Sequence, residues 1–253
     1  MKNNLHFYEH GNVEILYGKS NHCFPMHSHE CFCIGAVIDG NVLFNINNHE
    51  KLLKKSDIFI IPSNTAVKFE SDSTYEYITI CFKNELKIKS CRLYFNDYYV
   101  SDKDSERFMS LCSNFKDNND ENEFFNSILE LVSDVISHKY EDKNTCSNTV
   151  VADICRYIID HADQKFDLDE LSKTFFISKF HLIRIFKKEM GITPNQYHMQ
   201  AKMRILKSEI LKDKSETSLA MDLNLTDKSH MCKMFRKYMG ISIQSYKKNY
   251  KNK

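Results

Sequence analysis

The sequence predicts an α+β protein with a β-rich N-terminal half and an all-helical C-terminal half. Short apolar runs separated by turn residues fill about the first 95 residues, a pattern typical of small β-sandwiches and barrels. Apolar residues recur at helical spacing after about residue 100. A segment of about 20 residues is then repeated further along the chain, which indicates two copies of one supersecondary unit. The length of 253 residues leaves room for about two domains.

The composition is that of an ordinary globular protein. Of the residues, 42% are hydrophobic and 27% are charged, and no run approaches the roughly 18 apolar residues that a membrane helix needs. The start of the chain has no apolar core of a secretory signal, so we expect a cytoplasmic protein without a membrane partner. The nine cysteines contain no CxxC pair, and reduced thiols are expected.

Strands are predicted first along the chain. Residues 32–38 and 42–46 flank an Asp39-Gly40 step, which is a strong signal for a β-hairpin spanning residues 31–47. Asparagine and proline mark turns at Asn47-Asn48 and at residues 62–64. Further strands are expected at residues 14–17, 57–61, 66–70 and 75–82.

Two amphipathic helices are predicted next, at about residues 104–116 and 121–138. Their apolar stripes include Phe108, Leu111, Phe115, Leu131 and Val135. These stripes exceed what a helix pair needs to cover one face of a small barrel, so the surplus is expected to form a homodimer contact. The alternative is that the stripes only cap the barrel. The predicted units are a β domain at 1–98, a helical dimerisation segment at 99–140, a linker at 141–148 and a helical domain at 149–253.

Charge divides the chain at the predicted linker. Residues 1–148 hold 15 Lys and Arg against 22 Asp and Glu, a net charge of −7, whereas residues 149–253 hold 20 against 12, a net charge of +8. A basic C-terminal domain is typical of polyanion binding. A merely solvated basic surface would give the same charge.

The repeat aligns residues 178–197 with residues 227–246, and 8 of the 20 positions are identical. Each copy begins with a good N-cap, Ser178 or Asp227, and reaches a glycine, Gly191 or Gly240, where a left-handed residue would end the helix. Short helical patterns precede both copies, at residues 168–173 and 217–223, and a longer helix at 194–211 connects them. Each copy therefore reads as a helix-turn-helix unit.

Two such units could enter successive major grooves of duplex DNA. The exposed face of each long helix supplies the expected contacts. Phosphate contacts are assigned to Lys187, Lys188, Arg236 and Lys237. Base contacts are assigned to Lys179, Phe180, Ile183 and Arg184 in the first helix and to Lys228, Ser229, His230 and Lys233 in the second. Arg184 is the best candidate for a bidentate contact to guanine.

This C-terminal region resembles the AraC/XylS family of bacterial transcriptional regulators. The first copy matches the family pattern at Leu171, Ser178, Leu182, Arg184, Phe186, Lys187, Gly191, Thr193, Pro194 and Tyr197. The second copy matches at Leu219, Ala220, Asp227, Phe235, Gly240, Ser242 and Tyr246. The second copy departs from the family pattern at its turn, where Asn224-Leu225 replaces Gly-Phe, and at Lys233 and Ile243, which replace Arg and Pro. Since Asn tolerates the left-handed conformation, the fold should survive.

The N-terminal half resembles the cupin-like sensor domain of the same family. The resemblance rests on His27-Ser28-His29-Glu30, on Asp39-Gly40 and on residues 57–62, while Val67 stands about where a second-motif histidine would be. It implies an effector pocket inside a small β-barrel, followed by dimerisation helices. It also implies a regulator that acts on promoter DNA together with RNA polymerase, as an activator.

His27 and His29 are two apart on a strand, so they should project to one face. With Glu30 and Cys31 nearby, a zinc or iron site is conceivable, but the missing histidine leaves an incomplete set and Glu30 should point away. An effector contact or a structural role is favoured, and no metal and no cofactor are predicted. The expected effector-binding residues are His27, His29, Phe32, Ile34 and Phe44.

Two functions from different classes remain. The first is an effector-responsive, dimeric DNA-binding regulator that is not an enzyme, because no Ser-His-Asp, P-loop or Rossmann pattern is present. The second is a cupin-type metalloprotein or metalloenzyme with a helical appendage. The second must account for a repeated basic helix-turn-helix that catalysis does not need.

Overall fold

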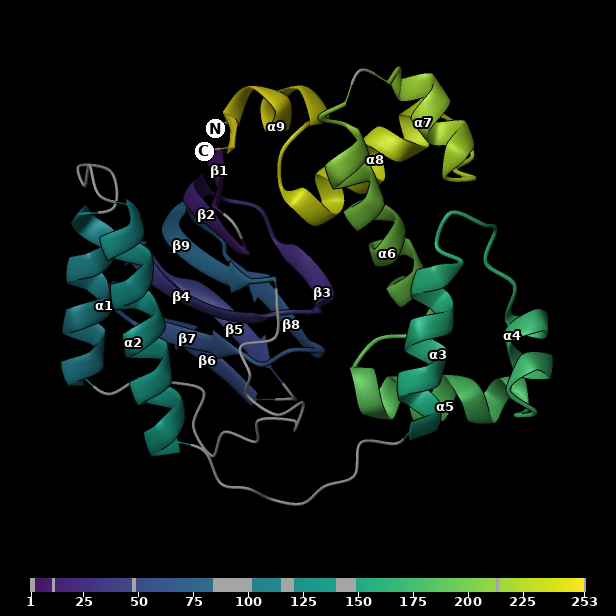
Figure 1. The fold of residues 1–253 in the computed structure, drawn as a ribbon, viewed down its shortest axis with the longest axis horizontal. Helices are drawn as coiled ribbons and strands as arrows, with labels where there is room; N and C mark the ends of the chain where they lie inside the picture. The colour runs from purple at the N-terminus through teal and green to yellow at the C-terminus, as the bar shows by residue number, and fades with distance from the viewer. Residues whose placement is uncertain are drawn as a thin grey trace.

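The computed structural model describes residues 3–10, 12–46, 49–83, 102–114, 121–139, 149–212 and 214–252. Within these ranges a β half carries a pair of helices on one side and faces a helical half on the other (Figure 1). The predicted α+β class, with antiparallel strands first and helix-turn-helix units last, is confirmed. The predicted linker at 141–148 lies outside the described residues.

The described strands form two sheets. The larger sheet has the order β10-β1-β2-β9-β4-β7 and the smaller has the order β3-β8-β5-β6. Apolar side chains, including the contacting rings of Phe44, Phe59 and Phe69, are packed into the core between strands of both sheets. The strands are β1 (Asn4–His10), β2 (Val13–Ser20), β3 (Phe24–His29), β4 (Phe32–Asp39), β5 (Val42–Ile46), β6 (His49–Leu53), β7 (Ile58–Ile61), β8 (Thr65–Glu70), β9 (Tyr75–Phe82) and β10 (Tyr250–Asn252).

The predicted hairpin at 31–47 is wrong, although both of its strands are present. β4 pairs with β9 and β7, whereas β5 pairs with β8 and β6 in the other sheet. Residues 32–37 are buried throughout, so β4 is a central strand that needs a partner on each side. The Asp39-Gly40 step therefore turns the chain from one sheet to the other, with Gly40 at φ 78°. The predicted Asn47-Asn48 turn lies outside the described residues.

The two predicted amphipathic helices are α1 (Asp102–Asn114) and α2 (Glu121–Lys139). Phe108 and Leu131 are fully buried in a core that is continuous with the β half, so much of the apolar stripe does cap the sheets. Leu129 on α2 remains 39% exposed. Phe115 and the side chain of Val135 lie outside the described residues, and dimerisation through this pair stays a prediction.

The helical half contains both predicted helix-turn-helix units. Pro194 opens the connecting helix, where a reciprocal pair of hydrogen bonds between Thr193 and Gln196 caps its first turn. β10 corrects the expectation that no strand follows residue 148, because it pairs in parallel with β1. The helices are α3 (Thr149–Asp160), α4 (Leu168–Thr174), α5 (Lys179–Met190), α6 (Pro194–Glu209), α7 (Glu216–Asp222), α8 (Lys228–Met239) and α9 (Ile243–Asn249).

The two units are anchored differently. α3, α4 and α5 enclose a core of their own around Leu171, Leu182 and Phe186, with Ala66 of β8 at its border. The core of the second unit, including Phe235 and Tyr246, is continuous with the core of the β half. The second unit is therefore joined to the N-terminal half far more tightly than the first.

Candidate nucleic-acid interface and effector cavity

Each recognition helix begins and ends as its sequence dictates. The hydroxyl of Ser178 accepts from the backbone N–H of His181 at the start of α5. The carboxylate of Asp227 accepts from the N–H of His230, at 2.8 Å, at the start of α8. Gly191 and Gly240 end the two helices at φ 71° and 73°. The predicted caps at these four positions are confirmed, and they set where both helices begin and end.

The turns inside the two units differ by one residue. The first runs from Phe175 to the cap Ser178, while the second has an additional residue before Asp227. Asn224 adopts the left-handed conformation, at φ 48°, as its place in the second turn predicts. In the first turn that conformation falls on Phe176, at φ 54°, whose side chain is 97% exposed. A bulky residue in this region of backbone conformation is uncommon. Nothing in the sequence marks Phe176 as exposed, because aromatic residues usually indicate a core position.

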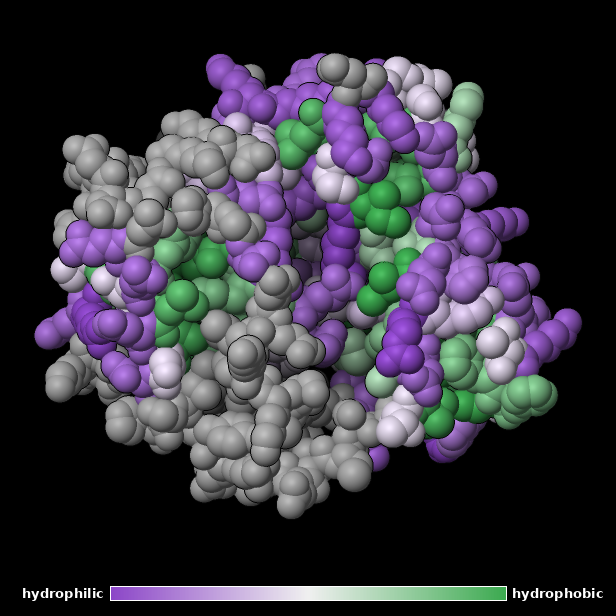
Figure 2. Space-filling model, in the orientation of Figure 1, coloured by the Kyte–Doolittle hydropathy of each residue, from purple (hydrophilic) through white to green (hydrophobic). Residues whose placement is uncertain are grey.

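The predicted DNA contacts lie on the surface of α5 and α8. Hydrophilic side chains cover much of the helical half in the view of Figure 2, with apolar patches among them. Phe180 is 88% exposed, while Ile183 and His230 are half-buried. The exposed members of the predicted set are Lys179, Phe180, Arg184, Lys187, Lys188, Lys228, Ser229, Lys233, Arg236 and Lys237.

Two of the predicted base-reading lysines are already paired within their own units. Lys179 forms an ion pair with Asp169 in the first turn of α4. At the equivalent place in the second unit, Lys228 lies 2.9 Å from Glu216, and the bond to that carboxylate raises the pKa of the lysine. In each unit, this ion pair therefore links the start of the recognition helix to the first turn of the helix that precedes it. Among the described residues, the guanidinium of Arg184 hydrogen-bonds Nδ1 of His181 at 3.1 Å and forms no ion pair with a carboxylate, so its charge stays available to a ligand.

The C-terminal ends of α5 and α8 rest on the β half. A Cβ at Gly191 would lie 2.7 Å from Cβ of Ala66, and one at Gly240 would lie 3.0 Å from the ring of Phe24. His22 on the β half also hydrogen-bonds the carbonyl of Lys237, at 2.8 Å. These close approaches leave the opposite, basic faces of the helices open.

A cavity of about 640 Å³ lies between the β half and the helical half. The surface is hollowed between these halves in Figure 2. One wall comes from the strands and includes His27, His29 and Tyr77, while α6 and α8 contribute residues such as Gln200 and Tyr238. The predicted pocket histidines thus line a cavity that is shared with the DNA-binding half. Phe32, Ile34 and Phe44 lie in the core rather than on its wall.

The two histidines form a hydrogen-bonded pair, with 3.0 Å between their Nε2 atoms. Burial, with His29 as a second cause, lowers the pKa of His27 to about 3, so His27 is neutral at pH 7. Nδ1 of His27 lies 2.7 Å from the carbonyl of Pro25 and must donate to it. Nε2 of His27 therefore accepts from His29, which leaves Nδ1 of a neutral His29 as an acceptor.

Three thiols gather on the strand side of the cavity, beside His29. Sγ of Cys33 lies 3.0 Å from Sγ of Cys81, 3.8 Å from Sγ of Cys31 and 3.3 Å from Nδ1 of His29. Hydrogen bonds from the other thiols lower the pKa of Cys31, whereas burial raises the pKa of Cys33. The seven cysteines in the described part of the chain are all free thiols.

The charges around the cavity are balanced. Among the described lining residues, three acids and three bases are paired one to one. Two of these pairs cross between the halves, because Arg204 and Lys207 of α6 bind acids of the β half. The pairs are Lys83 with Glu9, Lys207 with Glu14 and Arg204 with Glu30. The cavity is therefore electrically neutral apart from its titratable histidines and thiols.

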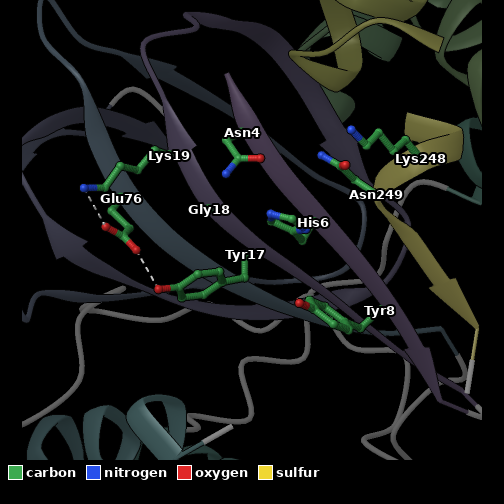
Figure 3. Close-up of a pocket in the computed structure, with 9 residues that line it drawn as sticks. All are labelled: Asn4, His6, Tyr8, Tyr17, Gly18, Lys19, Glu76, Lys248 and Asn249. Atoms are coloured by element: carbon green, nitrogen blue, oxygen red, sulfur yellow. Dashed lines mark hydrogen bonds and ion pairs between the residues drawn. The ribbon is translucent and has the colours of Figure 1, made fainter. Parts of the chain in front are cut away.

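A second hollow of about 520 Å³ lies on the outer side of β1 and β2, near the end of α9 (Figure 3). Glu76 accepts from the hydroxyl of Tyr17 at 2.5 Å and lies 3.2 Å from Nζ of Lys19. None of the predicted effector residues faces this hollow, so the cavity between the halves is the better candidate for a ligand.

Two family models match the chain in the order of its two halves. An AraC-like ligand binding domain matches residues 10–129, and a helix-turn-helix domain matches residues 171–249. The chain belongs to the AraC/XylS family of transcriptional regulators. It is a DNA-binding regulator whose N-terminal domain is of the effector-sensing type. The family consists of transcriptional regulators, which are generally not enzymes.

Relatives of this family extend over most of the chain. The Msm operon regulatory protein of Streptococcus mutans is 22% identical over 239 residues, which are 87% of this chain and 85% of that protein. The probable transcriptional regulator LumQ of Photobacterium leiognathi is 24% identical over 226 residues, 87% of this chain and 90% of its own. The structure of ToxT from Vibrio cholerae superposes with a TM-score of 0.62 at 11% identity, covering 94% of this chain and 98% of that one. At this low identity, the superposition shows a shared fold and nothing further.

No helix in the described part of the chain is both long enough and apolar enough to cross a membrane. Apolar side chains of the described helices pack into the two cores, although Leu129, Phe180 and Met221 remain exposed.

Proposed function

We propose that this protein is a dimeric transcriptional activator, and not an enzyme, that acts with RNA polymerase on promoter DNA in the cytoplasm. The proposal includes the predicted domain boundaries, which follow residues 98, 140 and 148. The observation that carries it is the pairing of two exposed basic recognition helices with a cavity that their own connecting helix, α6, helps to enclose. A ligand in that cavity contacts both halves, so it can favour one arrangement of the helix-turn-helix units over another.

DNA binding is tested with the full-length protein and a library of random duplexes. Selected sites should contain two half-sites about one helical turn apart, because two recognition helices enter successive major grooves. Affinity should fall steeply as salt rises, since each neutralised phosphate releases counterions. A selection that enriches no sequence, with binding that is insensitive to salt, would contradict the proposal.

Arg184→Ala should relax base preference at one position and cost about 1 to 3 kcal/mol of discrimination there. Lys188→Ala is the matched control, because this exposed lysine on the same helix is assigned to phosphate and should weaken binding to every sequence about equally. Fluorescence anisotropy on a panel of single-base site variants measures both effects. Equal, sequence-independent losses from the two substitutions would place Arg184 on the phosphate backbone.

The effector that fits the cavity is an apolar molecule with a neutral hydrogen-bond acceptor. Within the described structure, the hydroxyl of Tyr77 and Nε2 of Gln200 are buried without a hydrogen-bond partner, and both line the cavity. Arg204 and Lys207 are already neutralised by Glu30 and Glu14, so a carboxylate would have to displace an ion pair. One ToxT structure, 11% identical to this chain, holds an unsaturated fatty acid, so fatty acids and their neutral derivatives are suitable probes of the cavity.

The amide and the carboxylate of one medium-chain fatty acid provide a matched pair of probes. We expect the amide to bind more tightly, by isothermal titration calorimetry, because Tyr77 and Gln200 gain an acceptor and no ion pair is broken. Tighter binding of the carboxylate would show that the ion pairs of the cavity open for an anion.

The homodimer is tested by sedimentation of the full-length protein. A monomer at micromolar concentration, both alone and with the selected DNA, would contradict dimerisation through α1 and α2. Leu129→Glu places a charge on the exposed apolar part of α2 and should weaken a dimer that uses this surface.

A further inference from the structure

Four potential metal ligands meet on the strand wall of the cavity. His29 ends β3, Cys31 lies in the following turn, Cys33 is on β4 and Cys81 is on β9. Cys33 and Cys81 are directly opposite each other across the β4–β9 pairing. The ligand atoms of His29, Cys33 and Cys81 all lie within 4.8 Å of one another. His29, Cys31 and Cys81 also line the cavity, so an ion can reach the cluster from there.

The spacing is close to that of a tetrahedral site. Two sulfurs bound at about 2.3 Å to one tetrahedral ion lie about 3.8 Å apart, and a sulfur and an imidazole nitrogen lie about 3.6 Å apart. The Cys31–Cys33 separation is 3.8 Å and the distance from Cys33 to Nδ1 of His29 is 3.3 Å. Of these three separations, the 3.0 Å between Cys33 and Cys81 is the one that must widen appreciably, and Cys31 must approach the group formed by His29, Cys33 and Cys81 to complete the tetrahedron.

A hydrogen-bond chain behind the cluster aims His29 at it. The carbonyl of Pro25 holds the proton of His27 on Nδ1, His27 accepts from Nε2 of His29, and the Nδ1 lone pair of His29 then faces the thiols. Histidine ligands of metals generally donate their second N–H to a carboxylate, a carbonyl or a water, which fixes the tautomer and the ring orientation. Here Nε2 of His27 is the acceptor. A buried cluster of ordinary core thiols needs no histidine oriented in this way.

We propose that His29, Cys31, Cys33 and Cys81 bind one thiophilic d¹⁰ cation, Zn²⁺ or Cu⁺, in the wall of the cavity. Three cysteines and one histidine are a common ligand set for tetrahedral zinc, and thiolates also select Cu⁺. Each thiol that binds releases its proton to solvent. The metal site is an addition to the proposed function. Its test measures metal binding alone, so the result does not depend on DNA binding or on the organic effector.

The full-length protein is purified under reducing, oxygen-free conditions, stripped with a chelator and then titrated separately with Zn²⁺ and with Cu⁺. We expect one equivalent of bound metal per chain, measured by elemental analysis after gel filtration. Titration with Co²⁺ should produce the thiolate-to-metal charge-transfer absorption and the intense visible bands of a tetrahedral site. Competition with chelators of known affinity measures how tightly each cation is bound, and the cation that the protein retains against the stronger chelator is the preferred one.

Cys81→Ser and His29→Gln each remove one ligand and should weaken binding at least about 10-fold, the smallest loss seen even for residues behind a metal site. Cys23→Ser is the matched control, because Cys23 is an exposed thiol of the same half outside the cluster and should bind as the unaltered chain does. His27→Ala removes the partner of His29 and should cost about 10- to 100-fold. Circular dichroism of each stripped variant confirms that it is folded.

Three results would overturn the proposal. The unaltered chain could fail to retain either ion, Cys81→Ser and His29→Gln could both bind as tightly as Cys23→Ser, or thiol titration could show a Cys33–Cys81 disulfide in the folded protein together with no bound metal. Because Cys81 and His29 are only half-buried, their substitution leaves the fully buried Cys33 and the core in place.

Discussion

Lys207→Ala is expected to lower the free energy of unfolding by about 3 kcal/mol, the lower end of the cost of breaking a buried ion pair. Nζ of Lys207 bonds both carboxylate oxygens of Glu14, and the two side chains are only 21% and 12% exposed. Burial opposes the charge of the lysine, but Glu14 outweighs it, so the pKa of Lys207 lies above its usual value. Removing the lysine leaves Glu14 uncompensated at the junction of the two halves. Denaturant unfolding followed by circular dichroism measures the loss.

Two controls separate this pair from an ordinary surface contact. Lys212→Ala breaks a pair with Glu209 in which the lysine is 63% exposed, and it should cost well under about 1 kcal/mol. The double variant Glu14→Gln, Lys207→Met removes both charges and should recover much of the stability, because no buried charge is stranded. If Lys207→Ala cost no more than Lys212→Ala, the pair would not hold the halves together.

The helical half could be predicted well because its signals are local. Caps, C-terminal glycines and helical periodicity each depend on residues within a few positions of one another. The repeat presents the same signals at two places in the chain, so each copy supports the prediction for the other. The left-handed residue at Asn224 follows from the same reasoning. Phe176 was not found, because the first turn is one residue shorter and its strained position falls on an aromatic side chain.

The β half could be predicted only in part, because pairing is not local. The strand positions at 32–38 and 42–46 were right, yet the Asp39-Gly40 step joins two sheets instead of closing a hairpin. A turn signal predicts where the chain changes direction, but it does not predict which other strand pairs with each of the two strands that it joins. The unbroken run of apolar residues and glycine at 32–37 was the sequence signal that favoured a central strand, and the structure buries all six residues.

The thiol cluster could not be predicted from the sequence for the same reason, because it depends on strand pairing. The sequence pattern indicated the position of Val67 for a further metal ligand, and no histidine stands there. The structure brings Cys81 to Cys33 instead, through the register of β4 with β9. Because 48 residues separate them in the chain, their proximity depends on strand order, which the sequence left open.

The unequal anchoring of the two helix-turn-helix units leads to the largest expected effect. Tyr246 is 1% exposed and packs edge-on against Phe7 of β1, with ring centroids 4.7 Å apart. It also contacts Phe235 of α8 and Tyr250 of β10. Tyr246→Ala should lower the free energy of unfolding by about 3 to 5 kcal/mol, the usual cost of truncating a large buried aromatic residue. It should also loosen the pairing of β10 with β1, because the ring lies between these strands and α8.

The repeat supplies the control for this prediction. Tyr197 is equally buried and contacts Phe186 with the same ring separation, 5.5 Å, as Tyr246 has to Phe235. Its unit has a separate core, so Tyr197→Ala should cost similar stability within the unit but leave β1 protected. Hydrogen exchange of the β1 amides distinguishes the two, and we expect faster exchange only in Tyr246→Ala. Equal exchange in both variants would mean that the second unit is no more tightly coupled to the β half than the first, and that a cavity ligand reaches DNA through α6 alone.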